Sequence, residues 1–308
     1  MRLYMAEKNN FEKQLFALTT ILHSELTINT TKYTFGASGF YYTETSCGDQ
    51  QVQGPHWEKI EKHWLITNKH VLFPKLDDKT EHFIDSLTFN LRQVVNGKVE
   101  WIPIELNKEQ LAEQTLLHNN IIVDVVAIDV TKQISDTLMK SIKSGNNSII
   151  VPSALTQKNL PDNQPLTIDV TTDIIVASYP KGFYDEFNKF PIIKSGIVAS
   201  GWGFHFNGDP LFEIDAQLFP GSSGGLVISK PTNIAMINGS LSYAHDKQFV
   251  LLGIYSGEYF WKEKIKMSDG HEETMERSYG LGNVWYSYLI PEIIETGHRM
   301  INFNSPDI

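Results

Sequence analysis

Three short runs of the 308-residue chain carry residue types that could act together in nucleophilic catalysis. The run 215–225 ends in Gly-Ser-Ser-Gly-Gly, the run 65–71 contains a histidine, and the run 123–128 contains an aspartate. A serine hydroxyl is a weak nucleophile until an imidazole takes its proton, and a carboxylate that orients the imidazole makes it a better base. The order His, Asp, Ser along the chain is one of the known orders for such a triad. The three runs therefore predict attack of a serine on an acyl carbon.

The glycine-rich run contains two adjacent serines, and Ser223 is the predicted nucleophile. In the pattern Gly-x-Ser-Gly-Gly, Gly221 stands two residues before Ser223. The backbone N–H groups of Gly221 and Ser223 can then converge on one developing oxyanion, so these two residues form the predicted oxyanion hole. Ser222 competes for the role of nucleophile, and the run taken alone is also compatible with a flexible linker. The specificity of the prediction comes from the three runs together.

The candidate base is His70, because it follows the apolar run 64–67 at a strand-to-turn position. The chain has ten histidines, so a histidine alone carries little information. Asp124 is the candidate orienting carboxylate, since it opens the alternating segment 124–128 and a carboxylate in this role is buried. Asp129 competes with Asp124, but the polar residues that follow it predict the exposed end of the strand.

The segments that must position these residues have the pattern of short β-strands. Val, Ile, Phe and Tyr dominate the segments and turn residues separate them, which is typical of an all-β barrel or sandwich. Residues 291–302 begin with Pro-Glu and have apolar residues at helical spacing, which predicts a C-terminal helix. The expected strand segments are 15–23, 38–42, 64–67, 121–130, 173–177, 196–199, 225–229 and 250–255.

The organisation expected from the sequence is a single large domain, because no internal repeat and no Pro/Gly/Ser linker is present. Two polar stretches, about 75–115 and 257–280, are expected to be long charged loops, which are also places where binding specificity resides. The predicted divisions are an N-terminal arm or short helix at 1–14, a domain at 15–302 whose two halves separate near 150–170, and a tail at 303–308.

The composition excludes some classes of partner. A net charge of −10 and a pI of about 5.5, without a cluster of basic residues, argue against nucleic acid and against an anionic membrane surface. The single cysteine, Cys47, cannot form an intrachain disulfide and is predicted to be a surface thiol without a function. The N-terminus lacks the shape of a signal peptide, and no apolar run has the ~20 residues of a membrane span. The expected location is the cytoplasm.

The chain resembles the trypsin-fold serine peptidases, in particular the bacterial branch that includes the high-temperature-requirement (Deg) proteases. Five local patterns carry this resemblance over about residues 15–300. They are the run 35–40, similar to the first Gly-x-Gly-Phe strand with one residue added; 65–71, similar to Thr-Asn-x-His-Val; 124–128, similar to Asp-x-Ala-x-Leu with Val126 for the alanine; 176–182 with 195–200, similar to the Tyr-Pro-x-Gly and Gly-Ile-Val-Ser pair; and 215–225, similar to Asp-Ala-x-x-x-Pro-Gly-x-Ser-Gly-Gly.

The resemblance implies an all-β fold of two perpendicular six-stranded β-barrels with a C-terminal α-helix and the site between the barrels. It implies a serine endopeptidase that hydrolyses peptide bonds in proteins or peptides through an acyl-enzyme, without a metal or an organic cofactor. Gln217 stands six residues before the nucleophile, where enzymes that cleave after Lys or Arg have Asp. The segment 253–257 corresponds to the far wall of the specificity pocket. The pocket predicted from this is neutral, is formed by Gln217, Tyr255, Ser256 and Gly257, and favours side chains other than basic ones.

The chain departs from the pattern of the family that it resembles, and these departures lead to further expectations. Ser222 stands where secreted trypsin-like enzymes have the Asp that pairs with a freed N-terminal amine, so we expect no zymogen activation of that type. We expect no PDZ module, and expect instead that a regulatory partner or an ordering transition gates the enzyme.

Two alternatives belong to other classes. One is a catalytically silent or partner-gated binding module with the trypsin fold, and the retention of all three triad candidates counts against a silent one. The other is an esterase or lipase, which requires a Gly-x-Ser-x-Gly elbow and an acid after the serine.

Overall fold

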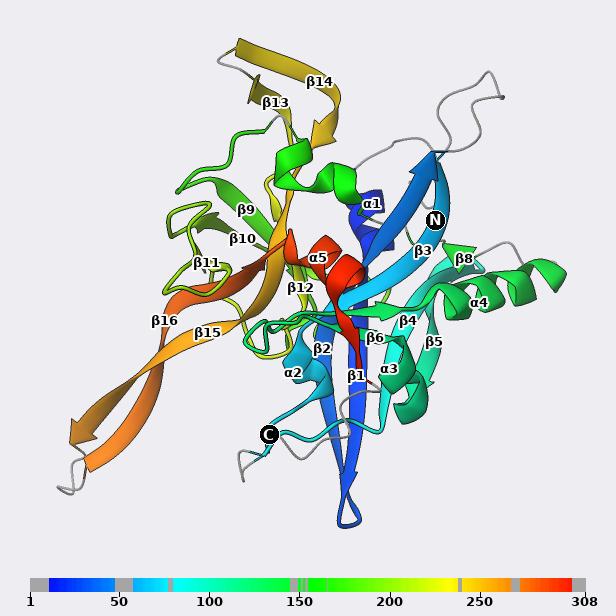
Figure 1. The fold of residues 1–308 in the computed structure, drawn as a ribbon, viewed down its shortest axis with the longest axis horizontal. Coiled ribbons are helices and arrows are strands. Elements are labelled where there is room, and N and C mark those ends of the chain that lie inside the picture. The colour runs from blue at the N-terminus through cyan, green and yellow to red at the C-terminus, as the bar shows by residue number, and fades with distance from the viewer. Residues whose placement is uncertain are drawn as a thin grey trace.

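The computed structural model describes residues 11–47, 58–76, 80–144, 149–150, 152, 155–164, 166–237, 240–266 and 272–300. Within these residues the chain is mostly β-structure, and Figure 1 shows an N-terminal sheet and a C-terminal barrel side by side. The helices are α1 (Phe11–Leu18), α2 (Lys69–Leu72), α3 (Lys108–Gln114), α4 (Thr131–Lys143) and α5 (Leu289–Thr296). Short 3-10 turns are η2 (Gln157–Asn159), η3 (Pro161–Asn163) and η4 (Pro180–Gly182).

The N-terminal sheet has the strand order β17-β6-β7-β3-β2-β1-β4-β5, with β8 paired to β4. In the part of the chain that the structure describes, the two ends of this order are not paired, so the second closed barrel expected from the sequence is not shown. The helix α3 lies between β5 and β6 in sequence. The strands are β1 (Thr19–Ile28), β2 (Thr31–Cys47), β3 (Glu58–Thr67), β4 (Ser86–Val95), β5 (Lys98–Asn107), β6 (Thr115–Leu117), β7 (Val126–Asp129), β8 (Ile149–Ile150) and β17 (His298–Arg299).

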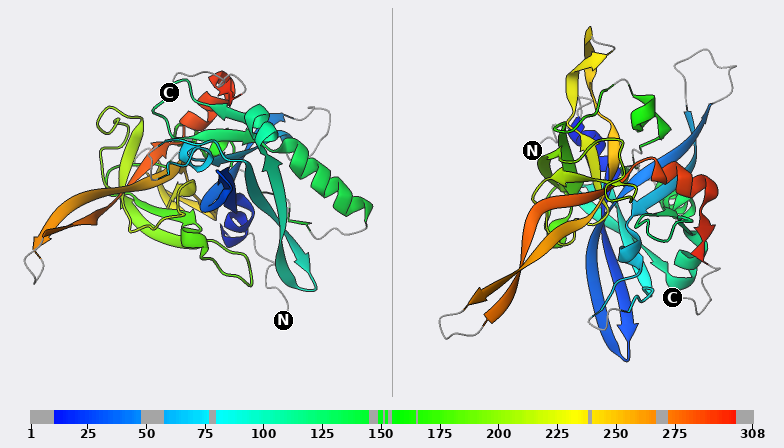
Figure 2. Two further views of the ribbon diagram at one scale, coloured as in Figure 1. Left: turned by 90° about the horizontal axis from the view of Figure 1, so that it is seen from below. Right: turned by 60° about the vertical axis from the view of Figure 1, so that its left-hand side comes forward.

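The C-terminal half contains a closed six-stranded barrel in the order β10-β11-β16-β15-β12-β9, and its neighbouring strands are antiparallel. A separate hairpin, β13 with β14, projects from the body next to it (Figure 2). The strands are β9 (Asp173–Ser178), β10 (Ile192–Val198), β11 (Leu211–Asp215), β12 (Gly225–Ser229), β13 (Thr232–Ile237), β14 (Ser240–Gln248), β15 (Leu251–Lys266) and β16 (Glu272–Tyr286).

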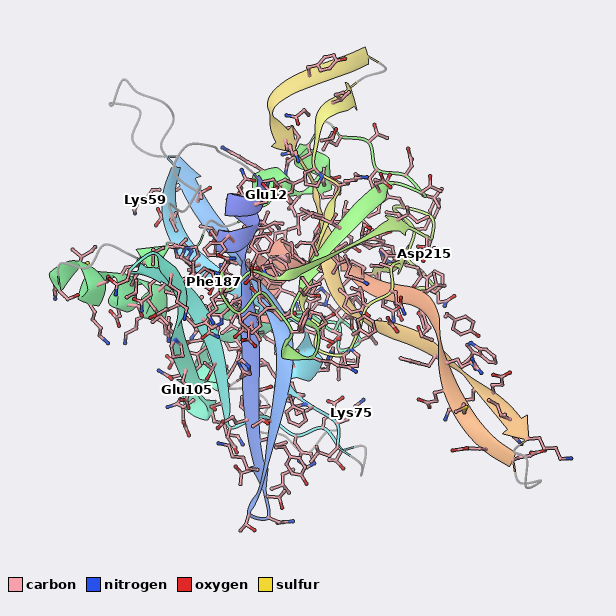
Figure 3. All side chains as sticks on the ribbon, turned by 180° about the vertical axis from the view of Figure 1, so that it is seen from behind. Glu12, Lys59, Lys75, Glu105, Phe187 and Asp215 are labelled. Carbon is pink, nitrogen blue, oxygen red and sulfur yellow. The ribbon has the colours of Figure 1, made fainter. Side chains whose placement is uncertain are left out.

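The core joins the two halves, because several strands are buried on both faces. In β2, Phe40 packs into a hydrophobic cluster formed by residues of both halves, whereas Tyr41 packs into a second cluster formed mainly by the N-terminal half. In β9, Ala177 packs into the same shared cluster, and Val176 packs inside the barrel. Successive side chains of a strand point to opposite faces, so each strand contributes to two clusters. In Figure 3, Lys75 and Glu105 lie on the side of the sheet and Asp215 on the side of the barrel.

Two stretches that the sequence analysis predicted as charged loops are regular structure. The stretch 75–115 contains β4, β5 and α3. In the stretch 257–280 the described residues, 257–266 and 272–280, belong to β15 and β16, which form a long hairpin that extends away from the body (Figure 2). Two ion pairs join the strands of this hairpin: Lys262 contacts Glu276, and Arg277 contacts Glu263. Charged side chains on both strands of an exposed ribbon hide the apolar alternation that predicts a strand.

The terminal elements also differ in their bounds. The expected C-terminal helix at 291–302 is present as α5, but it begins at Leu289 and ends at Thr296, because His298 and Arg299 pair with β6. The segment 15–23, expected as a strand, is divided between α1 and β1. Residues 1–10 of the predicted arm and the tail 303–308 lie outside the described residues, as does the side chain of Cys47. The division of the domain near 150–170 stays a prediction.

Candidate active site

His70 is presented by a single helical turn that follows a buried strand. The strand β3 ends at Thr67, and Asn68 keeps an extended backbone (φ −83°, ψ 151°) before α2 begins. Val71 and Leu72 of α2 are buried, so the short helix is fixed by its apolar side and His70 faces outward. The His70 side chain is 46% exposed and is therefore accessible to a substrate.

Asp124 lies in the loop before β7 and contacts His70 twice. Its Oδ2 atom is 2.7 Å from His70 Nδ1, and its Oδ1 atom accepts a hydrogen bond from the His70 backbone N–H at 2.8 Å. The hydroxyl of Ser256 donates to Asp124 Oδ2 at 2.6 Å. A carboxylate bonded to Nδ1 fixes the tautomer in which Nδ1 carries the proton, and this leaves Nε2 as the proton acceptor. The sequence-predicted pair of base and carboxylate is thus in direct contact.

The pKa values of both groups favour the charged pair. Burial lowers the pKa of His70, but the charge of Asp124 and its hydrogen bond raise it by more, so the net pKa lies above its ordinary value. Burial raises the pKa of Asp124, but His70, Ser256 and the His70 backbone N–H lower it by more, so its net pKa lies below its ordinary value. An imidazolium formed during a reaction would be stabilised where it forms.

The backbone conformation of the run 215–225, which contains Ser223, depends on two glycines. Asp215 ends β11 and begins the run, and Gly225 begins β12. Gly221 and Gly224 have φ values of +89° and +77°, which side chains disfavour. A Cβ atom on Gly221 would lie 2.7 Å from the backbone nitrogen of Lys181, and one on Gly224 would overlap the carbonyl oxygen of Ser38. The turn therefore depends on glycine at both positions.

The two adjacent serines have different surroundings. Ser222 is fully buried, and its hydroxyl accepts a hydrogen bond from Ser178 Oγ at 3.1 Å. Ser223 is partly exposed, and its hydroxyl donates to the carbonyl oxygen of Ser256 at 2.9 Å. Only Ser223 is therefore accessible to an acyl group.

Ser256 links Ser223 to the acid–base pair. Its carbonyl oxygen accepts from Ser223 Oγ, and its own hydroxyl donates to the Asp124 carboxylate that holds His70. Among the described residues no hydrogen bond joins Ser223 to His70 directly. In catalytic sites the hydrogen bond between nucleophile and base often forms only when substrate is present.

The backbone N–H groups of Gly221 and Ser223 make no hydrogen bond to any other part of the described chain. The surrounding peptide groups are held: Ser222 N–H donates to Phe219 O at 3.0 Å, and Lys181 N–H donates to Pro220 O at 2.7 Å. Two free donors on a fixed turn beside the Ser223 hydroxyl are what a developing oxyanion requires.

The four predicted pocket residues differ in their exposure and in the parts of the fold to which they belong. Gln217 is exposed, whereas Tyr255 is 2% exposed and packs inside the barrel. Gly257 pairs with Asn283 of β16. The sequence predicts Ser256 only as a pocket residue; its contact with Asp124 is not predicted, because no local pattern indicates it. The assignment of these four residues to a substrate pocket stays a prediction.

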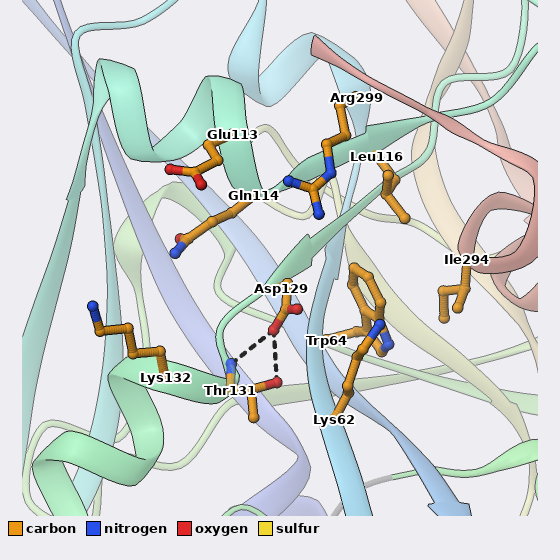
Figure 4. A pocket seen from close by; sticks show the side chains of 10 residues that line it. All are labelled: Lys62, Trp64, Glu113, Gln114, Leu116, Asp129, Thr131, Lys132, Ile294 and Arg299. Atoms are coloured by element: carbon orange, nitrogen blue, oxygen red, sulfur yellow. Dashed lines mark hydrogen bonds between the residues drawn. The ribbon is translucent and has the colours of Figure 1, made fainter. Parts of the chain in front are cut away.

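Asp129, the rejected competitor of Asp124, is at the far end of β7 from the site. Its carboxylate accepts from the backbone N–H and the hydroxyl of Thr131, at 3.1 and 2.6 Å. It lines a separate cavity of about 540 Å³, in which Lys62, Lys132 and Arg299 also take part (Figure 4). No group of His, Cys, Asp and Glu in the described part of the chain has a geometry that could hold a metal ion. None of the described helices has both the length and the apolarity needed to cross a bilayer.

No protein-family model and no curated protein matches this chain. The mostly β architecture, with one closed six-stranded barrel and a C-terminal helix, is compatible with a trypsin-like fold.

Proposed function

We propose that the protein is a serine endopeptidase of the trypsin-fold class, with Ser223 as nucleophile, His70 as base and Asp124 as orienting carboxylate. One observation carries the proposal: three residues from separate parts of the chain belong to one continuous series of hydrogen bonds. The series runs from Ser223 through Ser256 to Asp124 and His70, with distances of 2.9, 2.6 and 2.7 Å. The direct contact between His70 and Asp124, with the accessible Ser223 linked through Ser256 to the same carboxylate, favours catalysis over a coincidence of burial.

In the proposed reaction a protein or peptide substrate displaces the Ser223 hydroxyl from the Ser256 carbonyl. Ser223 Oγ attacks the acyl carbon while His70 Nε2 takes the hydroxyl proton, and Asp124 stabilises the imidazolium. The oxyanion accepts hydrogen bonds from the N–H groups of Gly221 and Ser223. The imidazolium then protonates the leaving amine, and water repeats the sequence to release the acyl group.

The finer family relation is part of the same proposal. We assign the N-terminal sheet to the position of the first barrel of the trypsin fold, with the order interrupted between β5 and β6, where α3 is inserted. The relation to the Deg branch rests on the five sequence patterns and on the glycine turn around Ser223.

A second candidate, a partner-gated form of the same fold, is favoured by one contact. The Ser223 hydroxyl donates to Ser256 O rather than to the imidazole, which is the arrangement expected of a resting enzyme. In this form the purified chain hydrolyses peptides slowly until a partner or substrate reorients Ser223.

The test is hydrolysis of an unfolded protein substrate by the wild type and two single-serine variants. Ser223→Ala is expected to remove all activity above background, whereas Ser222→Ala, which changes a buried hydroxyl in the same turn, should keep activity within about tenfold of wild type. Equal loss in both variants would point to collapse of the turn, and hydrolysis that persists in Ser223→Ala would refute the proposal.

A further inference from the structure

Asn68 is a fully buried residue whose side chain connects the two halves of the site. Its Nδ2 atom donates to the carbonyl oxygen of Asp124 at 2.7 Å, and its Oδ1 atom accepts from the backbone N–H of Gly224 at 2.5 Å. Asp124 carries the orienting carboxylate, and Gly224 follows the nucleophile. The amide thus bridges the acid-bearing loop of the sheet and the nucleophile turn of the barrel.

The position of Asn68 in sequence makes this use of its side chain unexpected. An asparagine before a helix normally accepts a hydrogen bond from the helix's first N–H groups. Asn68 is the N-cap of α2, yet its side chain makes no capping bond. Its amide instead bonds to Asp124 and Gly224. Asn68 itself stands two residues before His70, the proposed base.

The peptide group that joins Ser223 to Gly224 is held from two sides by the N-terminal half. The carbonyl oxygen of Ser223 accepts from the backbone N–H of Ser38 at 2.8 Å, and the N–H of Gly224 donates to Asn68. Gly224 N–H also donates to Tyr255 O at 2.9 Å within the barrel. Because Ser38 contributes backbone, Asn68 is the side chain that ties this peptide to the loop of Asp124.

We propose that Asn68 is a positioning residue for the reaction, an inference that rests on the proposed function. Its planar amide has a donor and an acceptor at a fixed separation, so it sets the distance between the nucleophile turn and the acid–base pair. A misplacement of a reacting group by about 1 Å can cost roughly 10²-fold in rate. The residue touches no reacting atom, and its effect passes through the backbones of Asp124 and Gly224.

A purely structural role for Asn68 makes a different prediction. Any buried amide that loses its partners destabilises the fold, whether or not it lies near the site. Asn90 is a matched case, because it is buried in β4 and its Nδ2 atom donates to the carbonyl oxygen of Ile21 at 3.2 Å, within the N-terminal sheet. Comparison of the two asparagines separates loss of stability from loss of positioning.

The test measures the rate of covalent labelling of Ser223 by a fluorophosphonate, together with the midpoint of thermal unfolding, in four proteins. These are the wild type, Asn68→Ala, Asn68→Gln and Asn90→Ala, each assayed well below its unfolding midpoint. We expect comparable drops in midpoint for both alanine variants, but a labelling rate lowered about 10²-fold in Asn68→Ala and less than threefold in Asn90→Ala. Asn68→Gln keeps the donor and the acceptor of the amide but displaces them by one methylene group, so its labelling rate should also fall.

The kinetics of peptide hydrolysis separate positioning from stability, because a loss of stability alone would not lower kcat selectively in the folded enzyme. The loss in Asn68→Ala should fall on kcat with KM nearly unchanged, since Asn68 contacts no substrate. Labelling of Asn68→Ala within threefold of wild type, or an equal fall in Asn90→Ala, would overturn the inference while leaving the proposed function intact. Failure of Ser223 to react in the wild type and in Asn90→Ala alike would overturn both.

Discussion

In the proposed mechanism the N-terminal sheet provides the base and the carboxylate as side chains, whereas the closed barrel provides the nucleophile through the backbone of a tight turn. His70 and Asp124 hold each other by charge and hydrogen bonds, and the pKa of each is shifted by the other. Ser223 is placed by a turn that requires glycine at 221 and 224. The difference indicates that changes in the sheet half should alter the pH dependence of the chemistry, and changes in the barrel half should alter its geometry and stability.

The largest effect is expected from Asp124→Asn, which removes the negative charge that the carboxylate places beside His70. We expect kcat/KM for peptide hydrolysis to fall by roughly 10⁴-fold, because the imidazole loses its orienting charge. The charge of Asp124 raises the pKa of His70 and burial lowers it, so without the charge this pKa should fall. A base is active when neutral, so the acid limb of the pH profile should move to lower pH. An acid limb that stays in place or moves upward would contradict this account of the pair.

An intermediate effect is expected from Gly224→Ala, which breaks the geometry of the barrel's turn. The new Cβ would overlap Ser38 O and Thr67 Oγ1 at a positive φ, so we expect a loss of roughly 2–4 kcal/mol in the free energy of unfolding. Gly208 is the control, since its φ is +93° but a Cβ there meets no atom within 4 Å. Gly208→Ala should cost only about 1 kcal/mol by urea denaturation. Equal costs at the two glycines would show that the turn has no tight contact with the sheet.

The mildest change is expected from Glu213→Gln, which alters the pH dependence of stability and leaves the candidate catalytic residues in place. Its basis is a pKa shift of opposite sign to that of Asp124. Glu213 of β11 is 2% exposed, and burial, partly offset by the hydroxyl of Tyr259, raises its pKa from 4.5 to about 7. The folded state therefore holds a proton that the unfolded chain releases between pH 4.5 and 7, so the wild type loses stability as the pH rises through this window. The full loss is roughly 3 kcal/mol, at about 1.4 kcal/mol for each pKa unit.

Glutamine at this position cannot ionise, so the variant should lack this part of the pH dependence. The stability of Glu213→Gln relative to wild type should be higher at pH 8 than at pH 5, as measured by urea denaturation at both values. A relative stability that does not change with pH would show that Glu213 ionises freely in the folded protein.

The contact between His70 and Asp124 could be predicted from the sequence, because the candidate site residues lie in short runs with local signals. A glycine-flanked serine, a histidine after a buried strand and an aspartate before one are each determined by neighbouring residues, and His70 and Asp124 are in contact as expected. The preference for Ser223 over Ser222 agrees with the burial of Ser222. The mostly β character follows from the pattern of short apolar segments, and the C-terminal helix follows from Pro291 and the apolar spacing after it. The one closed barrel agrees with what the family resemblance implied.

The parts that the sequence did not predict depend on contacts between distant segments. The link from Ser256 to Asp124 spans 132 residues, and nothing beside either residue indicates it. Strands with charged partners, as in the ribbon of β15 and β16, lack the apolar alternation on which the prediction relied. The order of strands in the N-terminal sheet depends on which strand pairs with which, and a list of strands does not contain that information.

The central claim is that sheet and barrel together make Ser223 a nucleophile, and mass spectrometry of the fluorophosphonate-treated protein tests it most directly. The account predicts one adduct per chain, on the peptide that contains Ser223, in the wild type. It predicts no adduct in Ser223→Ala and labelling at least 10³-fold slower in His70→Ala. An adduct on another residue, or wild-type labelling that does not depend on His70, would contradict the claim.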